Sequence, residues 1–143
     1  FMSLTLAIIK PDAVGSGKAG KVLAHLEGKG FTVRALRLTT LSQAQAGTFY
    51  AVHQGRPFYD ELVEFMTSGP VIPMVLEADD SVTKLRGAIG ATDPAEAEEG
   101  TVRKLYAESK GRNAIHASDS DENAAIEIEF FFPTHEQLGI QGS

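Results

Sequence analysis

Cysteine is absent from this chain of 143 residues, and so is tryptophan. The lack of cysteine excludes a disulfide framework, a thiolate metal site and a cysteine nucleophile, and it permits a reducing compartment. No apolar run approaches the roughly 20 residues that a membrane-spanning helix needs. The short apolar run near the N-terminus follows no basic segment, so we expect no secretory signal. The chain is therefore expected to work in the cytoplasm, away from membranes.

Positive charge is scarce in the C-terminal part of the chain. The net charge is −6, from 13 Lys and Arg against 19 Asp and Glu. Residues 1–59 carry seven basic and two acidic side chains, whereas residues 60–143 carry six basic and seventeen acidic ones. A sequence-independent nucleic-acid binder needs a basic face for the phosphates, so we expect no specific nucleic-acid partner. A small phosphate pocket built from a few cations remains compatible with this charge.

Length and composition indicate one domain. Hydrophobic residues make up 43% of the chain, which is enough for a core in a protein of this size. The sequence contains no internal repeat, low-complexity tract or linker. We therefore expect residues 1–143 to form a single domain.

Hydrophobic periodicity predicts an alternation of strands and helices. Strands are expected over 4–9, 31–41, 71–78 and 113–118, and helices over 17–29, 42–50, 57–69, 81–89 and 120–131. The alternation in 126–129 would also suit a strand, but Ser120 is a good helix cap and favours the helix. The stretch from Gly90 to Arg112 is long and irregular, and such loops are usually functional or disordered.

Local signals refine this order of elements. Ser42 followed by Gln45 three residues later forms a capping box for a short helix. Pro73 lies within the expected strand 71–78 and suggests an edge strand or a bulge. The order suits helices that cover one face of a mixed or antiparallel sheet, and it leaves the order of the strands open.

His116 lies between an expected strand and an expected helix start, flanked by small residues. Three interpretations compete: a structural histidine, a metal ligand and a nucleophile. A metal site would need more ligands, and no His-x-x-x-His or Cys/His cluster accompanies this residue. A nucleophile needs a neutral ring with one nitrogen free and the other held by an acceptor. Glu127, on the apolar side of the expected helix, is a candidate acceptor.

Residues 113–120, Asn-Ala-Ile-His-Ala-Ser-Asp-Ser, resemble the active-site signature of nucleoside diphosphate kinases. Further matching pieces occur in the same order at 9–14, 49–50, 56–59, 68–70, Arg86, 90–94 and 100–103. Each piece alone is weak, but their joint order and spacing are highly specific. The resemblance extends over about residues 4–132 without a large insertion.

The resemblance implies a fold and an activity. The fold would be a ferredoxin-like α/β (α+β) sandwich, with a four-stranded antiparallel sheet covered by helices. The activity would be that of a nucleoside diphosphate kinase, which reversibly transfers the terminal phosphate of a nucleoside triphosphate to a nucleoside diphosphate through a phosphohistidine. Mg²⁺ would arrive bridging the nucleotide phosphates, with no protein ligand assigned. The chain would be a homo-oligomer, a tetramer or a hexamer.

The resemblance also implies roles for individual residues. His116 would be the nucleophile through Nδ1, Glu127 would accept a hydrogen bond from the other ring nitrogen, and Ser120 would help to hold that arrangement. The nucleotide contacts would be Lys10 and Tyr50 on the transferring phosphate, Arg86, Thr92 and Arg103 on the other phosphates, Asn113 on the ribose and Phe58 stacked on the base. From spacing alone, Lys10 would be a charge at a strand end and Phe58 a core residue.

Three positions depart from the common pattern of the family. Lys104-Leu105-Tyr106 replaces a segment that usually contains an acid, which adds positive charge beside the phosphate site. Lys110 replaces an apolar residue that would oppose the base, and Ala117 replaces the commoner glycine. None of these changes removes a residue with a direct chemical role, so we expect an active enzyme.

Overall fold

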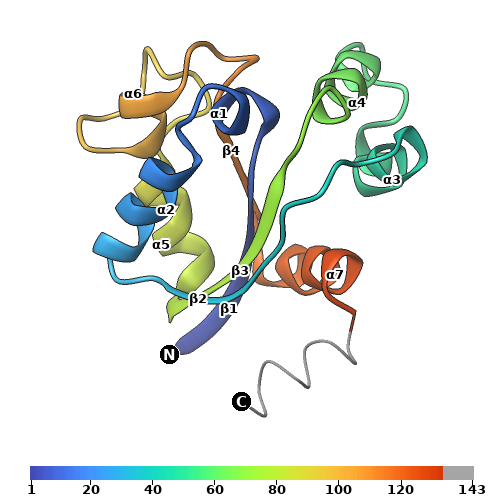
Figure 1. The fold of residues 1–143 in the computed structure, drawn as a ribbon. Coiled ribbons are helices and arrows are strands. Elements are labelled where there is room, and N and C mark those ends of the chain that lie inside the picture. The colour runs from blue at the N-terminus through green and yellow to red at the C-terminus, as the bar shows by residue number, and fades with distance from the viewer. Residues whose placement is uncertain (134–143) are drawn as a thin grey trace.

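The computed structural model describes residues 1–133, in which strands and helices alternate along the chain (Figure 1). The strands are β1 (Met2–Ile9), β2 (Thr32–Leu36), β3 (Ile72–Asp79) and β4 (Ile115–Ala117). The helices are α1 (Pro11–Gly15), α2 (Ala19–Gly28), α3 (Gln43–Phe49), the 3₁₀ turn η1 (Ala51–His53), α4 (Tyr59–Met66), α5 (Ser81–Ile89), α6 (Val102–Tyr106) and α7 (Asp121–Phe131). None of the described helices is both long and apolar enough to cross a membrane.

The four strands form one antiparallel sheet, as the resemblance implied, and their order, which the sequence left open, is β2-β3-β1-β4. β1 pairs with β3 over its whole length, from Met2↔Asp79 to Ile9↔Ile72. On its other side β1 pairs with β4, where Ile8 lies opposite His116. The sheet therefore places His116 directly beside the buried end of β1.

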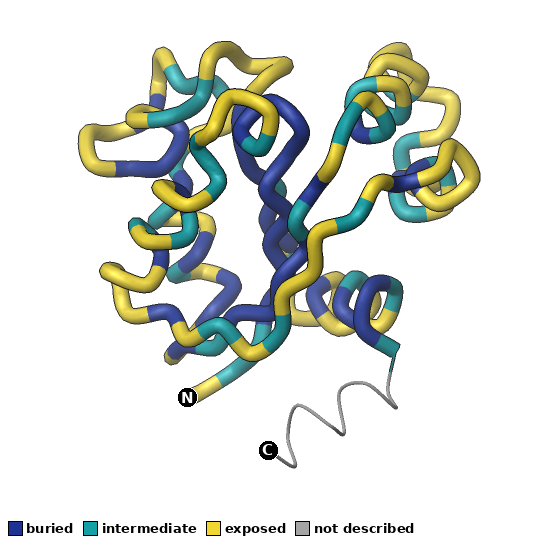
Figure 2. Tube along the Cα trace, viewed as in Figure 1, coloured by how far each residue is buried: buried dark blue, intermediate teal, exposed yellow. Residues whose placement is uncertain are grey.

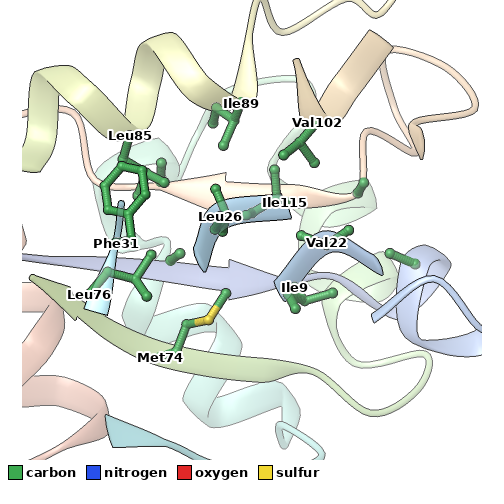
Figure 3. Close-up of a cluster of buried hydrophobic side chains, with 14 of the residues drawn as sticks. Ile9, Val22, Leu26, Phe31, Met74, Leu76, Leu85, Ile89, Val102 and Ile115 are labelled. Atoms are coloured by element: carbon green, nitrogen blue, oxygen red, sulfur yellow. The ribbon is translucent and has the colours of Figure 1, made fainter. Parts of the chain in front are cut away.

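Helices cover both faces of the sheet, which corrects the expectation of a single covered face (Figure 1). Successive side chains of a strand point to opposite faces. Ala7 and Ile9 pack into a cluster with α2 and α5 (Figure 3), whereas Leu6 and Ile8 pack into a second cluster with α3, α4 and α7. Thr5 to Ile9 of β1 are all buried (Figure 2), and the side chains of Leu6 to Ile9 enter both clusters, so this part of the strand does not alternate between apolar and polar residues.

Two helix caps behave as the sequence predicts. At α3 the Ser42 hydroxyl accepts from the Gln45 N–H at 3.1 Å, and the Gln45 side-chain oxygen accepts from the Ser42 N–H at 2.9 Å. At α7 the Ser120 hydroxyl accepts from the Asn123 N–H at 3.1 Å. This second cap decides between helix and strand for residues 126–129, which are helical.

Pro73 contradicts the expectation of an edge strand, since β3 lies between β2 and β1. The Pro73 carbonyl accepts from the Arg37 N–H at 3.1 Å, just beyond the last residue of β2. The N–H that proline lacks would point to this same side, past the end of the neighbouring strand, so the ladder within β2 loses nothing. The irregularity in pairing lies instead in β2, between Val33 and Ala35.

Two short helices were not expected from the sequence. α1 follows β1 directly and begins at Pro11, whose fixed φ suits the first helical position. α6 interrupts the irregular stretch 90–112, and the Thr101 hydroxyl caps it by accepting from the Lys104 N–H. Both helices have only five residues, too few for a periodic pattern to be visible.

Removal of a core side chain should destabilise the sheet strongly. Leu76 lies on β3 and is fully buried, so Leu76→Ala is expected to lower the free energy of unfolding by about 2–5 kcal/mol. Ile126→Ala, at a position that is 63% exposed, is the control and should change it by less than about 0.5 kcal/mol. Urea unfolding measures both values, and equal effects would contradict the assignment of this core.

Candidate functional site

His116 and Glu127 form a close pair between β4 and α7. His116 Nε2 lies 2.8 Å from Glu127 Oε1, and the two side chains are 20% and 19% exposed. A group of three or more acidic or histidine side chains that could hold a metal is absent from residues 1–133. The pairing with a single carboxylate therefore favours the nucleophile over the metal ligand.

Ser118, rather than Ser120, completes this pair. The Ser118 hydroxyl is buried and donates to Glu127 Oε1 at 2.8 Å. The Ser120 hydroxyl caps α7 and also bonds to the Asp119 side chain, and the role that the resemblance implies for Ser120 stays a prediction. The period of two along a strand places residues 116 and 118 on the same face, and this signal could have identified Ser118 from the sequence.

The geometry fixes which nitrogen of His116 can react. Glu127 Oε1 accepts from the Ser118 hydroxyl and faces His116 Nε2, so in a neutral ring the proton belongs on Nε2. Nδ1 then keeps its lone pair. The arrangement can deliver one uncharged, oriented ring nitrogen to an electrophile.

Aromatic rings from α3 and η1 surround the imidazole. Phe49 and Tyr50 approach the His116 ring edge-on, with centroid distances of 5.4 and 6.2 Å. The Tyr50 ring is also stacked against the His53 ring, and the ring centroids of His53 and Phe58 are 5.2 Å apart. These rings form one aromatic wall that runs from the His116 ring to Phe58.

Tyr50 carries a buried hydroxyl that lacks a hydrogen-bond partner among residues 1–133. Burial and the charge of Glu127 raise the pKa of Tyr50 well above its usual range, so the phenol keeps its proton. A buried donor without an acceptor is costly. A ligand oxygen beside His116 would supply the missing acceptor.

Phe58 is not a core residue, contrary to what its spacing suggested. It immediately precedes α4 and is 46% exposed. Its position at the outer end of the aromatic wall makes its ring available to a flat ligand.

Lys10 follows the last residue of β1 and is held by Asn113. Lys10 Nζ donates to Asn113 Oδ1 at 2.9 Å, and Asn113 Nδ2 donates to the Thr92 carbonyl at 3.3 Å. Burial and the nearby Arg103 lower the pKa of Lys10 from 10.5 to about 8, while Asp12 opposes this change. The three predicted residues Lys10, Thr92 and Asn113 therefore meet at one place.

Arg103 is buried and donates to three backbone carbonyls. Its Nη2, Nη1 and Nε lie 2.7, 3.0 and 3.4 Å from the carbonyl oxygens of Ile115, Gly90 and Asn113. A guanidinium has five N–H donors, so two of them remain for a ligand. Arg103 therefore fixes the loop and strand around His116 as well as offering charge.

Arg86 extends from α5 toward β4, the strand that carries His116. Its Nη1 donates to the Ala117 carbonyl at 3.2 Å. Burial and the charge of Arg86 lower the pKa of Arg103 to about 10. Two guanidinium groups that repel each other in this way form a local positive site that an anion would stabilise.

A strained turn precedes His116. Ala114 has a φ of +75°, and the Ile115 N–H donates to the Asn113 carbonyl at 2.9 Å, which closes a three-residue turn. This turn type is rare for residues other than glycine. Such outliers persist only where their surroundings hold them, and they concentrate at functional sites.

Known proteins match this chain over nearly its whole length. A sequence model of the family described as Nucleoside diphosphate kinase matches residues 3–137. The nucleoside diphosphate kinase of Chlorobium limicola is 58% identical over 139 residues, which are 97% of this chain and 99% of that protein. That of Persephonella marina is 53% identical over 128 residues, 90% of this chain and 91% of that protein.

Solved structures agree with the sequence matches. The Aquifex aeolicus nucleoside diphosphate kinase superposes with a TM-score of 0.92 at 45% identity, covering 95% of this chain and 99% of that one. The Halobacterium salinarum nucleoside diphosphate kinase in complex with CDP superposes with a TM-score of 0.90 at 37% identity, covering 95% and 91%.

The tautomer of His116 can be measured directly. In ¹⁵N-labelled protein, ring resonances of neutral His116 should show protonated Nε2 and unprotonated Nδ1, and Glu127→Ala should populate both tautomers. Ser118→Ala should weaken the preference, because it removes the second hydrogen bond to Oε1. Ser120→Ala is the matched control, and an effect of Ser120→Ala as large as that of Ser118→Ala would contradict the geometry.

Proposed function

The chain belongs to the nucleoside diphosphate kinase family, and on that premise we propose that His116 carries the phosphate between the two substrates. Enzymes of this family transfer the terminal phosphate of a nucleoside triphosphate to a nucleoside diphosphate, reversibly and through a phosphohistidine. One observation supports the choice of His116 above all others: Glu127 engages Nε2 at 2.8 Å and leaves Nδ1 to react.

In the first half-reaction, Nδ1 of His116 forms a bond to the γ-phosphorus while the bond to the β–γ bridging oxygen breaks. The electron pair leaves on that oxygen, and the nucleoside diphosphate departs. Nε2 keeps its proton, and Glu127 stabilises the positive charge that develops on the ring. In the second half-reaction a terminal oxygen of another nucleoside diphosphate attacks the same phosphorus, and the bond to Nδ1 breaks.

Phosphoryl transfer requires mainly positioning and charge stabilisation. We assign the transferring phosphate to Lys10 and Tyr50, which is supported by the buried ammonium and by the partnerless phenol. Arg86, Thr92 and Arg103 would hold the remaining phosphates. Arginine forks suit phosphate oxygens, and both guanidinium groups retain donors beyond those given to the backbone.

The nucleoside would lie along the aromatic wall. Asn113 is assigned to the ribose, and the exposed ring of Phe58 is assigned to the base. Stacking gives little readout of base edges, so we expect several nucleotides to be accepted. CDP in the Halobacterium salinarum relative supports a nucleoside diphosphate as the ligand. Lys104 and Lys110 are both exposed, which supports an intact reaction centre despite these departures.

Mg²⁺ is proposed to bind with the nucleotide phosphates rather than in a protein cage. The charged side chains proposed to contact the phosphates, Lys10, Arg86 and Arg103, are cations. Among residues 1–133, no cluster of acidic or histidine side chains could hold a metal. The ion would neutralise charge on the phosphate oxygens. Lys10, Arg86 and Arg103 would share that task from the protein side.

We further propose a single domain over residues 1–143 that forms a homo-oligomer, a tetramer or a hexamer, in the cytoplasm, without a specific nucleic-acid partner. Family membership and the net charge of −6 support these assignments. Residues 134–143 lie outside the part of the chain that the structure describes.

Labelling tests the nucleophile. Incubation with γ-³²P-labelled ATP should give an acid-labile, alkali-stable label that ADP discharges and His116→Ala abolishes. His25→Ala is the matched control and should retain the label, because His25 lies on α2. A protein that binds nucleotide but takes no label would show a binding module instead of an enzyme.

The pH profile tests Lys10. The Lys10 amine is a cation, and would bind phosphate as one, only while it is protonated. The pKa of Lys10 in the free protein is about 8, so kcat/KM should fall as the pH rises through this value. Lys10→Arg should move this alkaline limb to higher pH, because a guanidinium stays charged. If both proteins lose activity at the same pH, another group controls that limb.

A further inference from the structure

Asp12 is a buried carboxylate to which the reaction described above gives no role. It is the second residue of α1 and is 5% exposed. Its Oδ2 accepts from the Ala114 N–H at 3.0 Å, and its Oδ1 is buried without a partner in residues 1–133. Burying a carboxylate is unfavourable unless its contacts compensate. The burial of Asp12 therefore needs an explanation, and its bond to Ala114 is where we look for one.

The bond to Asp12 is made at the strained turn. Ala114 has the positive φ, and its carbonyl accepts from the Lys10 N–H at 2.8 Å. The turn is therefore held on one side by the backbone of Lys10 and on the other by the carboxylate of Asp12. Without that carboxylate, the amide of Ala114 would lose its acceptor and the turn could relax toward an ordinary φ.

We propose that Asp12 is a positioning residue for phosphoryl transfer, holding the Ala114 turn and thereby placing Asn113 and Lys10 against the nucleotide. Asn113 is the neighbour of Ala114, and its amide oxygen receives the Lys10 ammonium at 2.9 Å. A shift of the turn therefore displaces both groups together. This inference rests on the proposed contacts of Asn113 and Lys10 with substrate.

His116 is held by other means. It pairs with Ile8 across the sheet, and its ring is fixed by Glu127. Loss of Asp12 should therefore lower kcat/KM for the nucleoside diphosphate and leave the Nε2–H tautomer of His116 unchanged. General loosening of the fold would disturb the tautomer as well, so this readout separates positioning from a merely structural role.

Position and charge are separated by two matched substitutions. Asp12→Asn removes the charge but keeps an oxygen that can accept from Ala114, whereas Asp12→Glu keeps the charge and displaces the oxygen by one methylene. Positioning predicts that Asp12→Asn stays close to wild-type kcat/KM and that Asp12→Glu falls by about 10- to 100-fold. The reverse order, equal losses, or no loss in Asp12→Glu would overturn the proposal. All assays are made at temperatures where the variants are folded by circular dichroism.

A double-mutant cycle tests the route through Asn113. If Asp12 acts through Asn113, Asp12→Glu should cost much less in an Asn113→Ala background than in the wild type. Additive losses would overturn the proposed route. If Asn113→Ala alone leaves kcat/KM unchanged, the proposed ribose contact is wrong. The comparison of Asp12→Asn with Asp12→Glu still tests the positioning role of Asp12 in that case. The two proposals can therefore fail separately.

Discussion

The pairing of β1 with both of its neighbours is the constraint on which the site depends. β1 is buried on both faces and joins β3 to β4, so its position is determined from every side. Its end delivers Lys10, and the short helix that follows delivers Asp12. The same pairing sets Ile8 opposite His116. One strand end thus brings together residues that are more than a hundred positions apart.

In the proposed function, an acidic protein would bind a polyanion at this site because its cations are concentrated and partly dehydrated. Lys10, Arg86 and Arg103 come from both halves of the chain and lie close enough to influence one another. Burial and mutual repulsion lower the pKa of Lys10 to about 8 and that of Arg103 to about 10. A bound phosphate would relieve both effects, since an opposite charge favours the protonated forms. The net charge of −6 is a sum over the whole chain and does not report this local concentration of positive charge.

The sequence predicted the parts of the structure that depend on local signals. The cap at Ser42 and the helix begun by Ser120 follow from hydrogen bonds within four residues, and both are confirmed. The sequence predicted a strand over residues 4–9, but the order of elements suggested helices on one face of the sheet, whereas β1 contributes to a core cluster on each face. Contacts between distant segments were not predictable: nothing near Asp12 in the chain announces its bond to Ala114, and an alanine gives no sign of a positive φ.

One site must bind both the nucleoside triphosphate that gives the phosphate and the nucleoside diphosphate that receives it. The protein, and not the substrate, must therefore position the reacting groups. Arg103 is fixed by backbone carbonyls and His116 by Glu127, so neither must reorganise when the phosphate arrives or leaves. In the proposed function, Tyr50 and Arg86 would donate to the incoming oxygens. The Tyr50 hydroxyl has no partner in residues 1–133, and Arg86 donates to the Ala117 carbonyl. Preorganised donors of this kind stabilise transition-state charge without a reorganisation cost. Because the two half-reactions are the reverse of each other, the same fixed groups lower both barriers.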